Sequence, residues 1–231
     1  MACGTASIWI GSSRMHFEVL VEDQSGSIAL DVVLEMILGA NGANHSWRLH
    51  PYKGIGRIPR NLHAVADPRK RLLLDQLPRL LRGYGRSLQP GLGCVVVVVD
   101  LDDRDCRTFK QELLAVLHGC NPRPRTLFRI AIEEGEAWLL GDRRAVRAAY
   151  PAAADTVLHG YRQDSICGTW EVLADAVHPG GAVHLRRAGF RAAGKAKCEW
   201  AGRIAPHMDV NGNRSRSFRV FRDGVRDLAG I

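Results

Sequence analysis

The chain has 231 residues, of which 46% are hydrophobic and 24% are charged. These values are ordinary for a globular domain, and they exclude a largely disordered chain, a collagen-like repeat and a coiled-coil rod. The formal net charge of +8 favours polyanionic partners, and nucleic acid is the commonest of these. No stretch approaches the roughly 20 apolar residues of a membrane span, and the first residues lack the pattern of a signal peptide, so we expect no membrane association.

The six cysteines include no Cys-x-x-Cys pair. This pattern excludes the usual zinc sites and is typical of reduced thiols. We therefore expect a cytoplasmic protein without structural zinc.

The positive charge is unevenly distributed along the chain. Residues 143–231 carry 15 basic and 8 acidic side chains, whereas residues 101–142 carry 6 basic and 8 acidic ones. Such an acidic centre in a basic protein is either a solvated surface or a group of carboxylates around a divalent cation.

Residues up to 142 predict alternating strands and helices. Residues 16–22 have strand-like alternation, and residues 94–100 contain five consecutive valines, which is typical of a parallel strand buried on both faces. Two more strands are predicted at residues 47–53 and 126–132. The predicted helices cover residues 28–39 with Ser27 as cap, 69–84 with a kink or break at Pro78, 108–117 and 133–140. This order predicts an α/β protein with a mostly parallel sheet flanked by helices.

Beyond residue 142 the sequence predicts helices only, at residues 143–150, 170–177, 195–204 and 217–228. These helices form either a second lobe or a layer on the sheet. We divide the chain into an N-terminal extension at residues 1–14, set apart from the fold, an α/β domain at residues 15–142 and a helical C-terminal region at residues 143–231 packed on or beside the sheet.

Acidic side chains follow three of the predicted strands. Glu22 ends the first strand, Asp100 and Asp102 close the valine strand, and Glu133 follows the fourth. Ligands of α/β sheets bind outside the carboxyl ends of the parallel strands, so we expect these acids at one edge of the sheet. Their oxygen atoms suit Mg²⁺ or Mn²⁺, although acids at strand ends also serve simply to cap the next helix.

These residues carry a resemblance to a known fold. A strand ending in Glu22 and followed by a helix, with a later strand ending in Asp100-x-Asp102, resembles the Toprim fold of topoisomerases, primases and overcoming-lysogenization-defect nucleases. More narrowly, a family of uncharacterised bacterial Toprim-like proteins, often found beside an ATPase partner, is similar to this chain in the segments VLVEDQSG, VVVVVDLDD, AIEEGEAWLLGD, KCEWAGRIAPHMD and NRSRSF. The resemblance spans nearly all of residues 16–228.

The resemblance implies metal-dependent hydrolysis of phosphodiester bonds. Glu22 would act as general acid/base or metal ligand, and Asp100 with Asp102 would hold one Mg²⁺ or Mn²⁺. Glu133 or Glu136 would help to hold a second cation, so that attacking and leaving oxygen atoms are both stabilised.

The resemblance also implies a catalytic lysine on a late helix. Lys197, or Lys195 two residues earlier, matches the residue that neutralises charge at the scissile phosphate. The chain departs from the Toprim pattern in two ways: Asp23 follows Glu22 where a glycine is usual, and 77 residues separate Glu22 from Asp100.

Basic residues outside the acidic cluster are candidates to bind a nucleic-acid backbone. One pair lies in a glycine-containing loop that lacks P-loop spacing, so this loop does not predict nucleotide hydrolysis. Others lie on the late helices, where a solvated surface is an equally good interpretation. The candidates are Lys53, Arg57, Lys195, Arg214, Arg219 and Arg222.

The leading interpretation is a Mg²⁺- or Mn²⁺-dependent nuclease that acts on nucleic acid, with DNA as the first substrate to test. The resemblance adds an ATPase partner and a role in phage defence. Two alternatives stay open: a non-catalytic subunit that binds nucleic acid or a partner, and a phosphotransferase or nucleotide hydrolase for a small substrate. The sequence does not distinguish DNA from RNA and does not indicate an oligomeric state.

Overall fold

The protein is represented by a computed structural model, which describes residues 14–63, 67, 69–163, 165 and 168–231. The predicted N-terminal extension lies outside the described residues except for Arg14. Within the described residues the strands are β1 (His16–Val21), β2 (Ser46–Pro51), β3 (Gly93–Asp100) and β4 (Thr126–Ala131). They form one parallel sheet in the order β2-β1-β3-β4, which confirms the predicted α/β fold with a parallel sheet.

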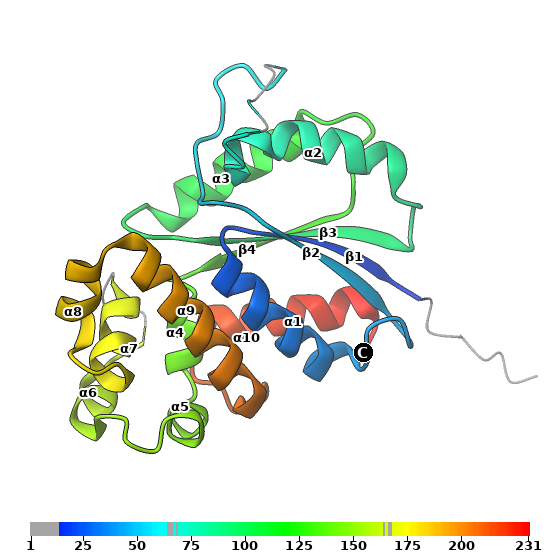
Figure 1. Cartoon of the computed structure of the whole chain (residues 1–231). Helices are drawn as coiled ribbons and strands as arrows, with labels where there is room; N and C mark the ends of the chain where they lie inside the picture. Colours follow the sequence, from blue (N-terminus) through cyan, green and yellow to red (C-terminus); the bar gives the residue numbers. More distant parts are fainter. Residues whose placement is uncertain (1–13, 64–66, 68, 164, 166–167) are drawn as a thin grey trace, which may run out of the picture.

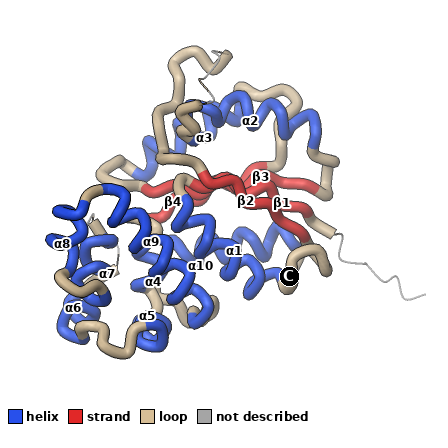
Figure 2. The backbone as a smooth tube through the Cα atoms, in the orientation of Figure 1, coloured by secondary structure: helices blue, strands red, loops and turns tan. Residues whose placement is uncertain are grey.

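Helices cover both faces of this sheet (Figure 1, Figure 2). On one face lie α2 (Leu73–Ser87) and α3 (Cys106–His118), and on the other lie α1 (Gln24–Leu38) and α10 (Arg216–Ala229). The remaining helices lie beside α1 and α10: α4 (Glu136–Leu140), α5 (Arg143–Ala149), α6 (Asp155–Gly160), α7 (Thr169–Val177), α8 (Gly181–Ala188), α9 (Phe190–Ile204) and a short 3₁₀ helix (Ala205–His207). None of the described helices combines the length and the apolar character needed to cross a bilayer.

The valines of β3 are buried on both faces of the sheet, as predicted. Val95, Val97 and Val99 belong to the hydrophobic core that the sheet shares with α2 and α3. Val96 and Val98 belong to the core on the opposite face, with residues of α1, α9 and α10. All five are at most 6% exposed, and burying each stabilises the fold by about 1.5–3 kcal/mol. This strand therefore fixes the centre of the sheet.

The helical region after residue 142 shares its core with the sheet. Val146, Leu158, Leu173 and Leu185, from α5, α6, α7 and α8, belong to the same buried cluster as Val96. In addition, α9 packs along α1, and α10 packs directly on β4. The region is thus partly a layer on the sheet and partly a group of helices beside it.

Several element ends differ from the prediction for local reasons. Asp23, not Ser27, caps α1: its side chain accepts a hydrogen bond from the Gly26 amide at 2.7 Å, and Ser27 is buried inside the helix. Pro78 lies within α2 and does not end it, and α2 begins only at Leu73. The short helices α6 and α8 were not predicted, because each has too few residues to show a helical period.

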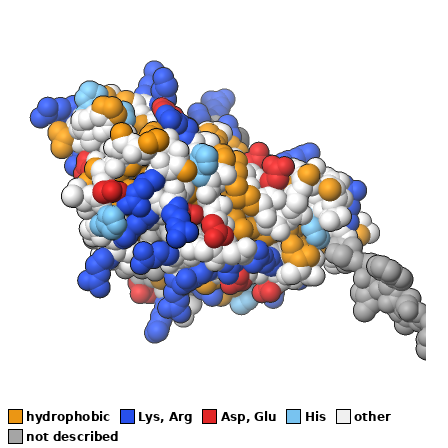
Figure 3. Space-filling model, turned by 90° about the horizontal axis from the view of Figure 1, so that it is seen from below, with side chains coloured by type: hydrophobic (Ala, Val, Ile, Leu, Met, Phe, Trp, Pro, Cys, Tyr) orange, Lys and Arg blue, Asp and Glu red, His pale blue; other side chains and the backbone are white. Residues whose placement is uncertain are grey.

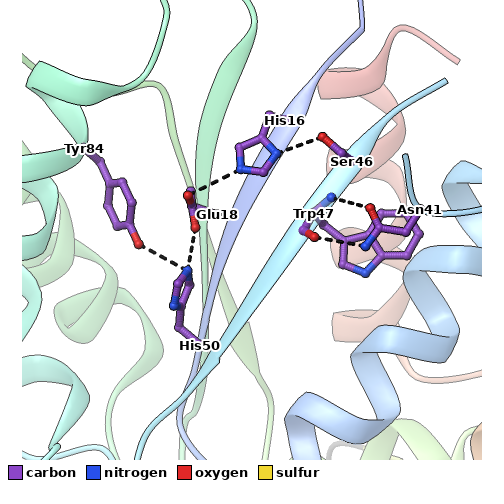
Figure 4. Close-up of polar contacts among 7 residues, drawn as sticks. All are labelled: His16, Glu18, Asn41, Ser46, Trp47, His50 and Tyr84. Atoms are coloured by element: carbon purple, nitrogen blue, oxygen red, sulfur yellow. Dashed lines mark hydrogen bonds and ion pairs between the residues drawn. The ribbon is translucent and has the colours of Figure 1, made fainter. Parts of the chain in front are cut away.

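A polar network around the buried Glu18 joins β1, β2 and α2 (Figure 4). Glu18 is 9% exposed, and its carboxylate oxygen atoms lie 2.5 Å from Nε2 of His50 and 3.4 Å from Nε2 of His16. The Tyr84 hydroxyl lies 3.4 Å from the same His50 nitrogen. A polar position in an alternating strand predicts a side chain in solvent, so this network was not foreseen.

Candidate active site

Glu22 and Asp100 meet at the carboxyl edge of the sheet. β1 and β3 are parallel neighbours in which Val21 pairs with Val98, so Glu22 lies beside the end of β3. The backbone amide of Asp100 donates a hydrogen bond to Oε2 of Glu22 at 3.2 Å. The pairing of the two strands thus holds one predicted acid against the other.

A cavity of about 50 Å³ lies next to these acids, on the face of the sheet covered by α1. Much of its wall is apolar and includes Val98, Trp138 and Phe218. A single water needs about 10–15 Å³ of such space, so the cavity has room for a few waters or for a cation with some of its water. Its charged lining consists of Glu22, Asp23, Asp100, Glu136 and Lys197.

Lys197 supplies positive charge to this cavity. Its Nζ lies 3.1 Å from Oε1 of Glu136 and 3.9 Å from Oδ2 of Asp23. The packing of α9 on α1, through buried residues such as Ala196 and Trp200, holds the lysine there. Burial alone lowers the pKa of Lys197, but Glu136 and the other nearby carboxylates more than reverse this effect. The ammonium group therefore stays charged at neutral pH.

Glu136 is buried in the cavity wall, with 4% of its surface exposed. Burial raises its pKa, and the charge of Lys197 only partly offsets this. One carboxylate oxygen, Oε1, pairs with the lysine, whereas Oε2 is buried without a hydrogen-bond partner. A buried polar atom in this condition costs about 1–3 kcal/mol, so Oε2 indicates a position that a ligand can satisfy.

The acids at the strand ends also have raised pKa values. The pKa of Glu22 is raised from 4.5 to about 7, mainly by burial; the hydrogen bond from the Asp100 amide lowers it, the charges of Asp102 and Asp23 raise it, and the charge of Lys197 lowers it. Burial raises the pKa of Asp100 well above its ordinary value, and the neighbouring Glu22 raises it further. The site therefore holds more carboxylate than one lysine neutralises, and it can take up either protons or a cation.

Asp102 and Glu133 do not line this cavity. They have φ values of 51° and 72°, and the Asp102 amide donates to the Glu133 carbonyl at 3.1 Å. The Glu133 carboxylate accepts hydrogen bonds from the Tyr161 hydroxyl, at 2.5 Å, and from the Ser165 amide. The predicted helix start at residue 133 is wrong, because this turn delays α4 until Glu136.

The predicted metal ligands do not form a ready-made site. Among the described residues, no group of three or more His, Cys, Asp or Glu side chains is arranged to hold a metal ion. Asp102 and Glu133 lie outside the cavity lining, and the other predicted ligands share the cavity with Lys197. Any cation must therefore draw these carboxylates together or displace the lysine from Glu136.

Two predicted nucleic-acid contacts lie in the loop after β2. The Gly54 amide donates to the Glu22 carbonyl at 3.0 Å, which places the exposed Lys53 beside the end of β1. Arg57 is exposed farther along the loop, where its amide donates to Asp75 at 2.8 Å. Lys53 is thus well placed to contact a substrate at this edge.

The other predicted basic contacts have different surroundings. Lys195 is exposed on α9, two residues before Lys197 and hence on another side of the helix. Arg214 and Arg219 are exposed, whereas Arg222 donates a hydrogen bond to the Val210 carbonyl at 2.9 Å. None of these four residues is among those that line the carboxylate cavity.

Asp23 and Tyr161 were not predicted as site residues. Asp23 lies in the cavity wall next to Lys197, and its position directly before a helix is a recognisable N-cap pattern. Tyr161 binds Glu133 from a loop after α6, and no local sequence pattern marks it.

No protein-family model, curated protein or solved structure matches this chain. With no match from which a function could be transferred, the geometry of the cavity is the main support for a functional proposal.

The raised pKa of Glu22 predicts a stability that falls as pH rises. Below pH 4.5 the carboxyl is protonated in folded and unfolded chains alike; between 4.5 and about 7 the unfolded chain releases its proton first, so folding becomes less favourable. In metal-free buffer at about pH 8, we expect Glu22→Gln to raise the free energy of unfolding by about 1–3 kcal/mol, with a much smaller gain at about pH 5. Urea unfolding at both pH values measures this.

Glu35, an exposed acid on α1, provides the control for that experiment. Glu35→Gln should change the free energy of unfolding by no more than about 0.5 kcal/mol at either pH. An equal effect of Glu22→Gln at the two pH values would contradict the raised pKa.

The ion pair in the cavity makes a second prediction. Lys197→Met leaves the Glu136 carboxylate buried without its partner, so we expect a loss of about 3 kcal/mol in the free energy of unfolding at neutral pH. Glu136→Gln in the same chain should recover most of this loss, because no charge then remains to be compensated at that position. Lys195→Met is the matched control and should cost at most about 0.5 kcal/mol. Strictly additive effects of the two substitutions would show that the pair is not coupled.

Proposed function

We propose that this protein is a metal-dependent nuclease of the Toprim type, which hydrolyses phosphodiester bonds in nucleic acid. The observation that carries the proposal is the meeting of one lysine with the buried carboxylate of Glu136 and the partly buried carboxylates of Glu22 and Asp100, in a cavity at the carboxyl edge of a parallel sheet. Glu22 and Asp100 come from neighbouring strands, and Lys197 comes from a late helix, as the resemblance implies. The net charge of +8 supports a polyanionic substrate.

The cavity suits a hard divalent cation such as Mg²⁺ or Mn²⁺. Carboxylate oxygen atoms are the ligands that these cations prefer, and Oε2 of Glu136 has no hydrogen-bond partner. Glu22, Asp100 and Glu136 are the residues that would hold the ion. When bound, it supplies polarisation of a phosphoryl oxygen and a water of lowered pKa. The raised pKa values of the carboxyl groups favour the exchange of their protons for such a charge.

The protein's own residues have distinct roles in this proposal. Glu22 would act either as a ligand of the ion or as the general acid/base. In the second role it would not contact the ion, and its pKa of about 7 would let it take a proton from an attacking water and return it to a leaving group at neutral pH. Lys197 keeps its charge and can balance the negative charge that develops on the phosphoryl group. Lys53, exposed beside the end of β1, would contact the phosphate backbone.

The resemblance supports DNA as substrate, a partner ATPase and a role in phage defence. The cysteine pattern supports the cytoplasm as compartment.

A second candidate function is a non-catalytic subunit that binds nucleic acid. It is favoured by Lys197, which pairs with Glu136 and already supplies a positive charge inside the cavity. It is also favoured because the described part of the chain has no group of three or more His, Cys, Asp or Glu side chains set for a metal.

Cleavage assays separate the two candidates. With plasmid and labelled single- and double-stranded oligonucleotides, we expect cleavage in Mg²⁺ or Mn²⁺ and none in EDTA. Glu22→Gln and Asp100→Asn should each lower the rate at least about 100-fold while the protein stays folded and binds the substrate. Glu35→Gln should keep the full rate.

Cleavage that neither substitution slows would contradict the assigned active site. Binding that is the same in EDTA and in Mg²⁺, with no cleavage, would favour the second candidate.

A further inference from the structure

A second cavity, of about 340 Å³, lies at the C-terminal end of α4 and is far more basic than the first. No acidic residue is among those described in its wall. Its described wall comes from α4, α5 and α6, from residues 161–163 directly after α6, and from Arg214 shortly before α10. The polar and basic side chains in its wall are those of Arg143, His159, Tyr161, Arg162, Gln163 and Arg214.

Among the described residues, the arginines in the wall of this cavity have no acidic ion-pair partner. Burial lowers the pKa of Arg143, and the like charges of Arg214 and Arg147 lower it further. Arg147 is paired with Asp155 at 2.6 Å, but within the described chain neither Arg162 nor Arg214 has an acidic partner. Figure 3 shows basic side chains gathering on the side of the molecule that carries α5 and its neighbours. An anion bound here would relieve the repulsion between these groups.

The hydrogen-bonding groups of the cavity indicate what kind of anion fits. Arg143 donates to the Tyr161 carbonyl at 2.9 Å, which leaves other N–H groups of its planar guanidinium available. Planar guanidinium groups bind phosphate oxygen atoms in pairs. The Gln163 amide nitrogen donates to the Ala137 carbonyl at 3.4 Å, whereas its carbonyl oxygen is buried without a partner. That oxygen has almost no exposed surface, so a donor such as a sugar hydroxyl reaches it only when the Gln163 side chain turns toward the cavity.

The volume of the cavity also exceeds what a phosphate ion requires. A water occupies about 30 Å³ of liquid, and small-ligand sites begin at about 300 Å³. A phosphate group together with a sugar fits this range. We propose that this cavity binds the phosphomonoester and sugar of a nucleotide, either a free nucleoside monophosphate or the 5′-terminal nucleotide of a nucleic acid.

The site is distinct from the carboxylate cavity but adjoins it. Leu140 lies in its wall and Glu136 in the wall of the first cavity, only about 6 Å apart along the axis of α4. Tyr161, in its wall, donates to Glu133, whose carbonyl accepts from the Asp102 amide. Nucleotide binding here requires no metal and no catalysis, so it can be tested independently of the proposed nuclease function.

Calorimetric titration in EDTA with AMP, CMP, GMP and UMP tests the proposal. We expect at least one of them to bind, and to bind at least about tenfold more tightly than its nucleoside. Arg162→Ala and Arg214→Ala, both at exposed positions, should each weaken binding at least about tenfold, and Arg214→Lys should weaken it less. Arg107→Ala, an exposed arginine on α3 across the sheet, is the matched control and should leave the affinity unchanged.

Glu22→Gln should also leave nucleotide binding unchanged, so that failure of the nuclease assignment and failure of this site give different results. Competition of 5′-phosphorylated and 5′-hydroxyl oligonucleotides with the bound nucleoside monophosphate shows whether the natural ligand is a free nucleotide or the 5′ end of a nucleic acid. Displacement by the phosphorylated form alone indicates a terminal nucleotide, and displacement by neither indicates a free nucleotide. The proposal is overturned if no monophosphate binds better than its nucleoside, or if Arg214→Ala has no more effect than Arg107→Ala.

Discussion

The parallel sheet places negatively charged side chains close together at its carboxyl edge, and the rest of the structure has to accommodate them. Because β1 and β3 are neighbours and run in the same direction, Glu22 and Asp100 are delivered to one place, and a backbone hydrogen bond holds them there. Their surroundings include the apolar wall of a small cavity, where ionised carboxylates are costly. The sheet itself offers no cation in this wall, so the charge must be compensated from elsewhere in the fold.

The helical region provides that compensation. Lys197 reaches the cavity from α9, which is held by its packing on α1. The shared hydrophobic core explains why the helices after residue 142 are needed for the site and are not an appendage to it. One lysine does not satisfy all the acids, and Oε2 of Glu136 is left without a partner. The negative charge that Lys197 leaves uncompensated supports the binding of a cation in this cavity and, with it, phosphoryl chemistry.

Local signals predicted much of the fold, whereas long-range contacts decided the site. The valine strand and the acid that ends it were predictable, because burial on both faces leaves an unbroken apolar run before Asp100. Asp102 and Glu133 also follow strands, but both adopt positive φ in turns that bond to each other. Positive φ is uncommon for residues other than glycine, so there was no reason to expect it from the sequence at both positions. Glu18 is likewise hidden, because its partners come from another strand and another helix.

The carboxylates of Glu22, Asp100 and Glu136 are proposed to bind a divalent cation in their shared cavity. The most direct test is a crystal of the protein soaked in Mn²⁺, with the anomalous scattering of manganese used to locate the ion. We expect a peak in the cavity in contact with these carboxylates. A manganese peak elsewhere, or none while the Lys197–Glu136 pair stays intact, would contradict the claim.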